Sequence, residues 1–207
     1  MKRIKDKILP QIFIIYLRYL IGGAFVFASL IKIKGIRFTS ESGELNPINS
    51  AWHFFETMYQ SGLYWKFIGL AQLISGFFLM TQKFSKFGAL INFPIILNIF
   101  IITMSYYFAY TPVITGLMLL ANILLIIWEW HELKIIFNLI PNIDKTYRME
   151  KDVIWQLLGL VLFIFTFTYR VIVTQYKLVF WLTICILAGF IGLLFGLYRE
   201  KKRVRKI

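Results

Sequence analysis

The sequence predicts an all-α membrane protein with six transmembrane helices and both termini in the cytoplasm. Three observations support this prediction. The chain is 59% hydrophobic and only 16% charged, whereas a soluble domain is roughly 45–50% apolar. Its apolar residues gather in six long stretches. Its basic residues concentrate on alternate connections, as they do in multi-pass membrane proteins.

Each apolar stretch is long enough to cross the hydrocarbon core of a bilayer, which takes about 20 residues. The predicted spans are residues 11–33, 62–81, 87–108, 112–130, 153–173 and 178–198. The first resembles a signal peptide, but its apolar run is too long and no small-residue cleavage site follows, so we interpret it as a retained helix. We expect a four-helix bundle in residues 1–133, a cytoplasmic linker in 134–152 and a helical hairpin with a basic tail in 153–207.

The basic residues set the predicted orientation. Sixteen lysines and arginines lie on the side of the two termini and six on the other side, while Arg18 lies within a span. The positive-inside rule places the richer side in the cytoplasm. This distribution accounts for the net charge of +13 without nucleic-acid binding, which a basic soluble protein would suggest.

The first span carries a stripe of charged and small residues. At 100° per residue, five positions share one helical face: Arg18, Gly22, Phe25, Ser29 and Lys32. Arg18 lies roughly 11–12 Å inside the cytoplasmic edge; a charge that faces lipid at the centre of the membrane costs about 2.5–3.5 kcal/mol. Its guanidinium either snorkels to the interface or faces the bundle and finds acceptors. Snorkelling alone does not explain why Gly22 and Ser29, which permit close helix approach, lie on the same side.

Polar residues recur along the next three spans. The second span has glycines at 62, 69 and 76, with Gln72 between them. The third and fourth spans carry polar residues that share a face within each span: Asn92 and Thr103 in the third; Thr115, Asn122 and Glu129 in the fourth. Asn98 points elsewhere.

Two interpretations of these polar faces stay open. In one, the side chains hydrogen-bond to one another and hold the bundle together, at about 0.6 kcal/mol per bond. In the other, they line a cavity at mid-membrane for a lipophilic ligand. The residues predicted to contact that ligand are Arg18, Gln72, Asn92 and Asn122.

The long loop between the first two spans ends in the segment AWHFFETMYQ. Trp52, Phe55 and Tyr59 share one face of a predicted helix, which either lies in the interface or forms the first turns of the second span. Glu56 lies at a depth comparable to that of Lys32. We expect either a Lys32–Glu56 ion pair at the outer mouth of the bundle or an interfacial carboxylate in water.

The last two spans lack such polar faces. They offer hydroxyls and a run of glycines at 189, 192 and 196, which indicates a packing or oligomerising hairpin. The single cysteine, Cys185, excludes an internal disulfide and a CxxC pair. His53 and His131 lie on opposite sides of the predicted membrane, and neither belongs to a metal-ligand spacing. We predict no catalytic residues and no metal site.

The pattern R-x3-G-x2-F-x3-S-x2-K in the first span resembles the opening helix of the DoxX-like membrane proteins. The second span, FIGLAQLISGFFLM, the basic turn TQKFSKFGAL and the segments NFPIILNIF and PVITGLMLLANILLIIWEW continue the likeness over residues 18–133. The resemblance implies a four-helix module of the bacterial inner membrane, linked to quinone-coupled sulfur or thiol oxidation. This chain departs from the pattern by its added hairpin and by the absence of cysteine from the first four spans.

The resemblance leads us to expect a protein that binds a quinone or another lipophile in the four-helix core and supports a membrane redox partner, without being an autonomous enzyme. The four core residues named above would contact the ligand, with Lys32 and Glu56 at the outer mouth. The alternative is a non-enzymatic membrane accessory: an immunity, stress or defence protein, or an oligomeric pore former. Fold likeness alone does not decide between them.

Overall fold

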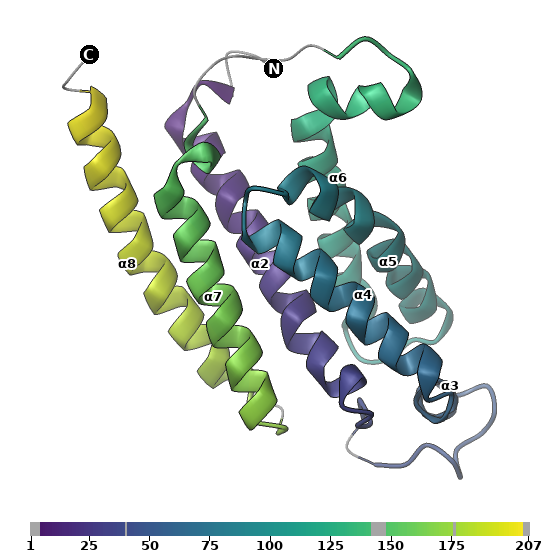
Figure 1. Ribbon diagram of the computed structural model, residues 1–207. Coiled ribbons are helices and arrows are strands. Elements are labelled where there is room, and N and C mark those ends of the chain that lie inside the picture. The colour runs from purple at the N-terminus through teal and green to yellow at the C-terminus, as the bar shows by residue number, and fades with distance from the viewer. Residues whose placement is uncertain (1–4, 40, 142–147, 176, 205–207) are drawn as a thin grey trace.

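The computed structural model describes residues 5–39, 41–141, 148–175 and 177–204. All regular secondary structure in these ranges is helical, without a strand (Figure 1). The α-helices are α2 (Ile8–Ile33), α3 (Ala51–Gln60), α4 (Leu63–Met80), α5 (Ser85–Ser105), α6 (Thr111–Leu133), α7 (Val153–Ile172) and α8 (Leu178–Val204). Two short 3-10 helices, η1 (Lys134–Phe137) and η2 (Met149–Lys151), lie between α6 and α7.

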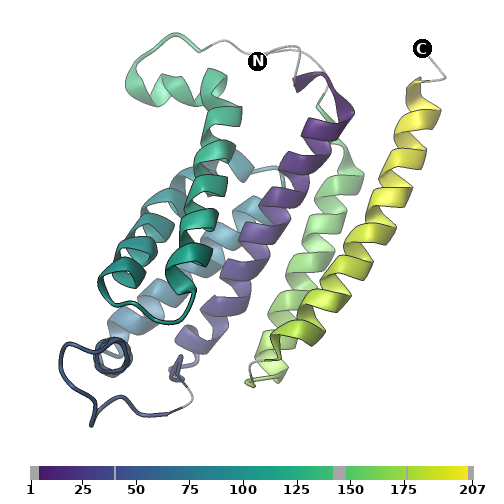
Figure 2. The same ribbon diagram turned by 180° about the vertical axis from the view of Figure 1, so that it is seen from behind.

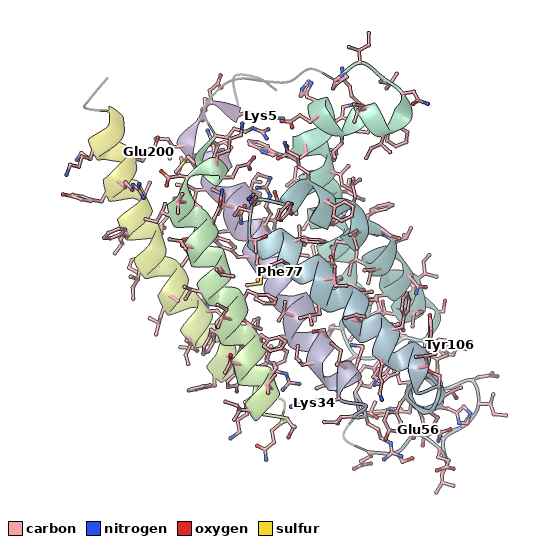
Figure 3. The ribbon with its side chains drawn as sticks, in the orientation of Figure 1. Lys5, Lys34, Glu56, Phe77, Tyr106 and Glu200 are labelled. Atoms are coloured by element: carbon pink, nitrogen blue, oxygen red, sulfur yellow. The ribbon has the colours of Figure 1, made fainter. Side chains whose placement is uncertain are left out.

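Six of these helices are long and apolar enough to cross a membrane, which confirms the predicted all-α fold with six spans. Residues 142–147 of the predicted linker and 205–207 of the predicted basic tail lie outside the described residues. In Figure 3, Lys5 and Glu200 lie at one end of the bundle, and Lys34 and Glu56 lie at the other. We call these the terminal end and the outer end; that the terminal end faces the cytoplasm stays a prediction.

Helix α2 is the centre of the molecule. It packs against α4, α6 and α7, whereas α8 packs mainly against α7 at the edge (Figures 1 and 2). Within the apolar window of each helix, 72% of α2 is buried but only 11% of α8. The α2–α4 contact is close because a Cβ atom on Gly22 would lie 2.9 Å from the Gly76 carbonyl oxygen. The small residues therefore do what the sequence predicted: they let two backbones meet.

Helix α7 belongs to the same bundle as the first four spans. A Cβ atom on Gly159 would overlap the Met80 carbonyl oxygen at the end of α4, and the Tyr19 hydroxyl on α2 donates to the Trp155 carbonyl oxygen. Helices α7 and α8 pack against each other as the predicted hairpin does, but α7 also packs into the bundle and α8 is the peripheral helix.

The glycine run of α8 faces inward. Cβ atoms on these glycines would meet Tyr16 at position 189, Leu158 at position 192 and Trp155 at position 196. The run therefore serves packing within the chain, one of the two roles that we predicted for it.

Helix α3 is a separate element and not the start of α4. The Ser50 hydroxyl caps it by accepting from the His53 N–H at 3.2 Å, and Gly62, with φ of +60°, separates it from α4. Such a φ is strained for residues with a Cβ atom. The predicted aromatic face packs at the outer end, where the rings of Trp52 and Phe55 contact that of Phe108.

Candidate functional site

Arg18 faces the interior of the bundle, where its side chain is 1% exposed. Its Nη2 atom lies 2.7 Å from Glu129 Oε1 on α6, and its Nη1 atom lies 2.6 Å from Glu150 Oε2 on η2. Nη1 also donates to Gln82 Oε1 at 2.9 Å, in the α4–α5 turn. Of the two predicted alternatives, the structure therefore shows the inward one: the guanidinium is paired and does not snorkel.

Further charges surround this pair. Arg148 Nη1 lies 2.8 Å from Glu129 Oε2 and 3.0 Å from Glu150 Oε1. Lys86, at the start of α5, pairs with Glu132. Three cations thus balance three carboxylates across four elements, which meets the requirement that buried charges be paired. We call this set the ionic cluster: Arg18, Lys86, Glu129, Glu132, Arg148 and Glu150.

The ionic cluster stabilises the charged form of Glu150, its carboxylate on η2. Burial raises the pKa of Glu150, but the charges of Arg18 and Arg148 together outweigh it, so the pKa lies below its usual value. Lys5, nearby, is 5% exposed and sits 5.4 Å from the centre of the Trp128 ring. Burial, and after it the charge of Arg148, lower the pKa of Lys5.

The predicted amides of the third and fourth spans meet each other. Asn92 Nδ2 donates to Asn122 Oδ1 at 2.9 Å. Asn122 Nδ2 donates to the Ala89 carbonyl oxygen at 3.1 Å, and the Ser75 hydroxyl donates to Asn92 Oδ1 at 3.0 Å. This chain joins α4, α5 and α6 in the dry interior, as the interhelical interpretation expects.

Gln72 is different from the other core amides. Its side chain is 3% exposed, yet no donor among the described residues reaches its Oε1 atom. A buried carbonyl without a donor is costly. Of the four predicted core ligand residues, Arg18, Asn92 and Asn122 are therefore engaged with protein groups, and Gln72 alone keeps an acceptor to offer.

Glu56 does not pair with Lys32, so the predicted ion pair at the outer mouth is wrong. Glu56 is 2% exposed, and its carboxylate accepts from Arg37 Nε at 2.9 and 3.0 Å and from the Gly43 N–H at 3.2 Å. The hydrogen bond from Arg37 lowers the pKa of Glu56 against the effect of burial. Arg37 pairs with Glu56 because the loop after α2 places Arg37 next to α3.

Lys32 lies instead among aromatic rings. Its Nζ atom donates to the Ala28 carbonyl oxygen at 3.0 Å and lies 5.2 and 5.6 Å from the ring centres of Trp65 and Phe38. The residue is 8% exposed. Within the described part of the chain, no carboxylate oxygen comes within 4 Å of this ammonium group.

An apolar groove runs between α2 and α8, beside α7. A cavity of about 300 Å³ forms its middle and is lined by Tyr16, Leu20, Gly23, Thr166, Trp181 and Cys185, among others. A second cavity of about 110 Å³ lies toward the outer end, lined by Ala24, Phe27, Ala28, Phe38, Leu178 and Trp181, among others. Trp181 is a wall of both cavities. We call the two together the α2–α8 groove.

Polar groups in the α2–α8 groove are engaged in holding α8 in place. The Tyr16 hydroxyl donates to the Gly189 carbonyl oxygen at 2.6 Å, and Trp181 Nε1 donates to the Thr166 hydroxyl at 3.0 Å. The surface left to a ligand is therefore hydrocarbon, which favours an acyl or isoprenoid chain over a polar molecule.

Several residues of these sites escaped the sequence reasoning. The sequence prediction uses Arg148 and Arg170 only as basic residues that set the orientation and does not single out Glu150, although Arg170 is 1% exposed and donates to the Phe27 carbonyl oxygen at 3.2 Å. The usable signal was Glu129, which the seven-residue spacing already placed on the inward face of α6. An arginine within one span and an inward glutamate in another are a candidate pair.

Comparison with known proteins places the chain in no family: no protein-family model, no curated protein and no solved structure matches it.

Proposed function

We propose that this multi-pass membrane protein is a DoxX-like protein of the bacterial inner membrane that binds a quinone or another lipophilic small molecule and supports a membrane redox partner. The observation that carries the proposal is the α2–α8 groove, with its 300 Å³ cavity. This volume is at the lower limit of known ligand pockets, roughly 300–1,000 Å³.

The groove is a better place for the ligand than the four-helix core in which we expected it. In the core, the ionic cluster and the Asn92–Asn122 chain use their hydrogen-bonding groups on one another. In the groove, the lining is apolar, and α8 on its far side is the least buried of the six long helices. A lipophile can therefore reach the groove from the bilayer past a single peripheral helix.

The residues support a binding role more than a catalytic one. The groove contains one thiol, Cys185, and hydroxyls that already bond between helices. We therefore assign any redox chemistry to a partner that exchanges the lipophile with this protein. The suggestion that a redox partner exists rests on the family resemblance.

The second candidate is a non-enzymatic membrane accessory. Its support is the ionic cluster, whose charges balance and tie α2, α5, α6 and η2 into one rigid body. A protein of this kind would present a fixed surface to a partner or to copies of itself, and the groove would hold structural lipid only.

The experiment purifies the full chain in lipid nanodiscs and titrates it with a short-chain quinone, reading tryptophan fluorescence because Trp181 lines the groove. Mass spectrometry identifies lipophiles that co-purify. The variant Cys185→Phe fills the groove, and Ile191→Phe adds the same ring to the 67% exposed outer face of α8 as a control. We expect only Cys185→Phe to weaken quinone binding. Absence of saturable binding, or equal binding by both variants and the unmodified protein, would favour the accessory role.

A further inference from the structure

Lys32 carries a buried charge beside the outer cavity of the α2–α8 groove, from which the Phe38 ring separates it. It is more than nine-tenths buried, and its ammonium has three donors but one hydrogen-bond acceptor, the Ala28 carbonyl oxygen. The rings of Phe38 and Trp65 supply cation–π contacts, which stabilise the charge without neutralising it. A buried charge without a counter-charge is unfavourable, so an anion at this position would gain from it.

The position of Lys32 connects it to the groove. Ala28 accepts its hydrogen bond and Phe38 faces its ammonium, and both residues line the 110 Å³ cavity. The guanidinium of Arg170 lies 4.3 Å from the centre of the Phe27 ring, which lines the same cavity. Two buried cations therefore flank the outer cavity of the groove.

The acidic residues of the outer end leave this charge unmatched. Glu56 is engaged with Arg37, and the other two carboxylates of the outer end that the structure describes, Glu41 and Glu44, are exposed in the loop before α3. Against these three carboxylates stand six basic residues on the outer side of the sequence. The excess of positive charge attracts anions to this end.

We propose that the lipophile is an anionic amphiphile, whose phosphate or carboxylate head binds Lys32 while its hydrocarbon chain lies in the α2–α8 groove. This inference rests on the proposed function and narrows its ligand class. The residues of α2 that line the two cavities extend from Tyr16 to Ile31, roughly 22 Å at 1.5 Å per residue. The Trp181 ring packs on Gly23 and Phe27 between the cavities, so a chain that occupies both cavities has to displace this ring.

The test compares oleate, oleyl alcohol and inorganic phosphate as probes. Native mass spectrometry measures their binding to the full chain in nanodiscs of zwitterionic lipid. Oleate and oleyl alcohol share a chain and differ in charge, so their affinity ratio isolates the head group. We expect oleate to bind about tenfold more tightly than oleyl alcohol, a gain typical of one charge-assisted contact, and phosphate not to compete at low millimolar concentration.

Three variants locate the head group. Lys32→Met keeps the length of the side chain and removes its charge, Lys32→Arg keeps the charge, and Lys66→Met removes an exposed lysine of the same end. We expect Lys32→Met alone to lose the oleate preference while it still binds oleyl alcohol. Should Lys32→Met fail to fold, the oleate to oleyl alcohol ratio of the unmodified protein still decides whether the bound head group is anionic, and Lys32→Leu replaces Lys32→Met in locating it.

The outcomes separate the inference from the proposed function. Equal affinity for oleate and oleyl alcohol in the unmodified protein, or an oleate preference that survives in Lys32→Met, would overturn the anionic head while leaving a lipophile site. Phosphate that displaces oleate at low millimolar concentration would assign the site to a free anion and overturn the amphiphile. Failure of both oleate and oleyl alcohol to bind would refute the proposed function itself.

Discussion

Removal of one charge from the ionic cluster offers the sharpest test of the interior. Arg18→Met keeps most of the side-chain volume but leaves Glu129 and Glu150 facing each other with less positive charge. Arg18 is 1% exposed, as is Glu129, so solvent screens neither. Breaking a buried pair in this way costs about 3–5 kcal/mol. We expect the free energy of unfolding of Arg18→Met to fall by that amount.

A second substitution restores the balance. In Arg18→Met with Glu150→Gln, two cations face two carboxylates again, because Lys86, Arg148, Glu129 and Glu132 remain. We expect the double variant to recover about 0.5–3 kcal/mol relative to Arg18→Met, the range of coupling between residues in one network.

The assay is reversible unfolding in mixed detergent micelles, followed by tryptophan fluorescence. The control is Arg199→Met, which removes an ion pair of 3.4 Å with Asp152 in which the arginine is 57% exposed; such pairs contribute at most about 1 kcal/mol. If Arg18→Met cost no more than Arg199→Met, or if the double variant were less stable than Arg18→Met, the balanced-cluster reasoning would be refuted.

Three further outcomes are expected. Gly159→Ala forces a methyl group onto the Met80 carbonyl oxygen and should lower the midpoint of thermal unfolding, at a cost of about 1–3 kcal/mol. In the control Gly189→Ala, the added methyl group meets only a Tyr16 ring atom at 3.3 Å, so the midpoint should change little. Equal midpoints for the two variants would contradict the close α4–α7 contact. Gln72→Leu removes an acceptor without a donor and should raise the free energy of unfolding by about 1 kcal/mol. A loss of stability in detergent would refute the unpaired state of the Gln72 carbonyl. The pKa of Glu150 in the folded protein lies below its value in the unfolded chain. Its contribution to the free energy of unfolding is therefore present above the unfolded pKa, about 4.3, and is lost as the pH falls through the folded pKa. A profile of the free energy of unfolding against pH should be flatter for Glu150→Gln than for the unmodified protein.

Hydropathy and helical periodicity predicted the parts of the fold that depend on single helices. The first predicted span, 11–33, corresponds to α2 (Ile8–Ile33) and the fifth, 153–173, to α7 (Val153–Ile172). The inward faces of Arg18, Asn92 and Asn122 were also predicted, because spacing along one helix determines which residues share a side.

Contacts between helices were harder to predict. Glu150 lies 132 residues from Arg18 in sequence, and no local pattern says which loop folds back onto which helix. The same limit explains why the predicted Lys32–Glu56 pair is wrong. Equal depth in the membrane made that pair plausible, but Glu56 pairs with Arg37, which lies only five residues from Lys32 in the sequence. The docking of α7 onto α2 depends on matched surfaces at Gly159 and Tyr19, which composition does not encode.

The span of sequence between Arg18 and its acidic partners also imposes an order on biogenesis. Translation at about 5–20 residues per second separates the synthesis of Arg18 from that of Glu150, 132 residues later, by roughly 7–26 s. Gln82 emerges first and offers an interim acceptor. Glu129 follows and Glu150 is the last of the three partners to be made, so the buried charge of α2 is neutralised only after most of the chain has been synthesised.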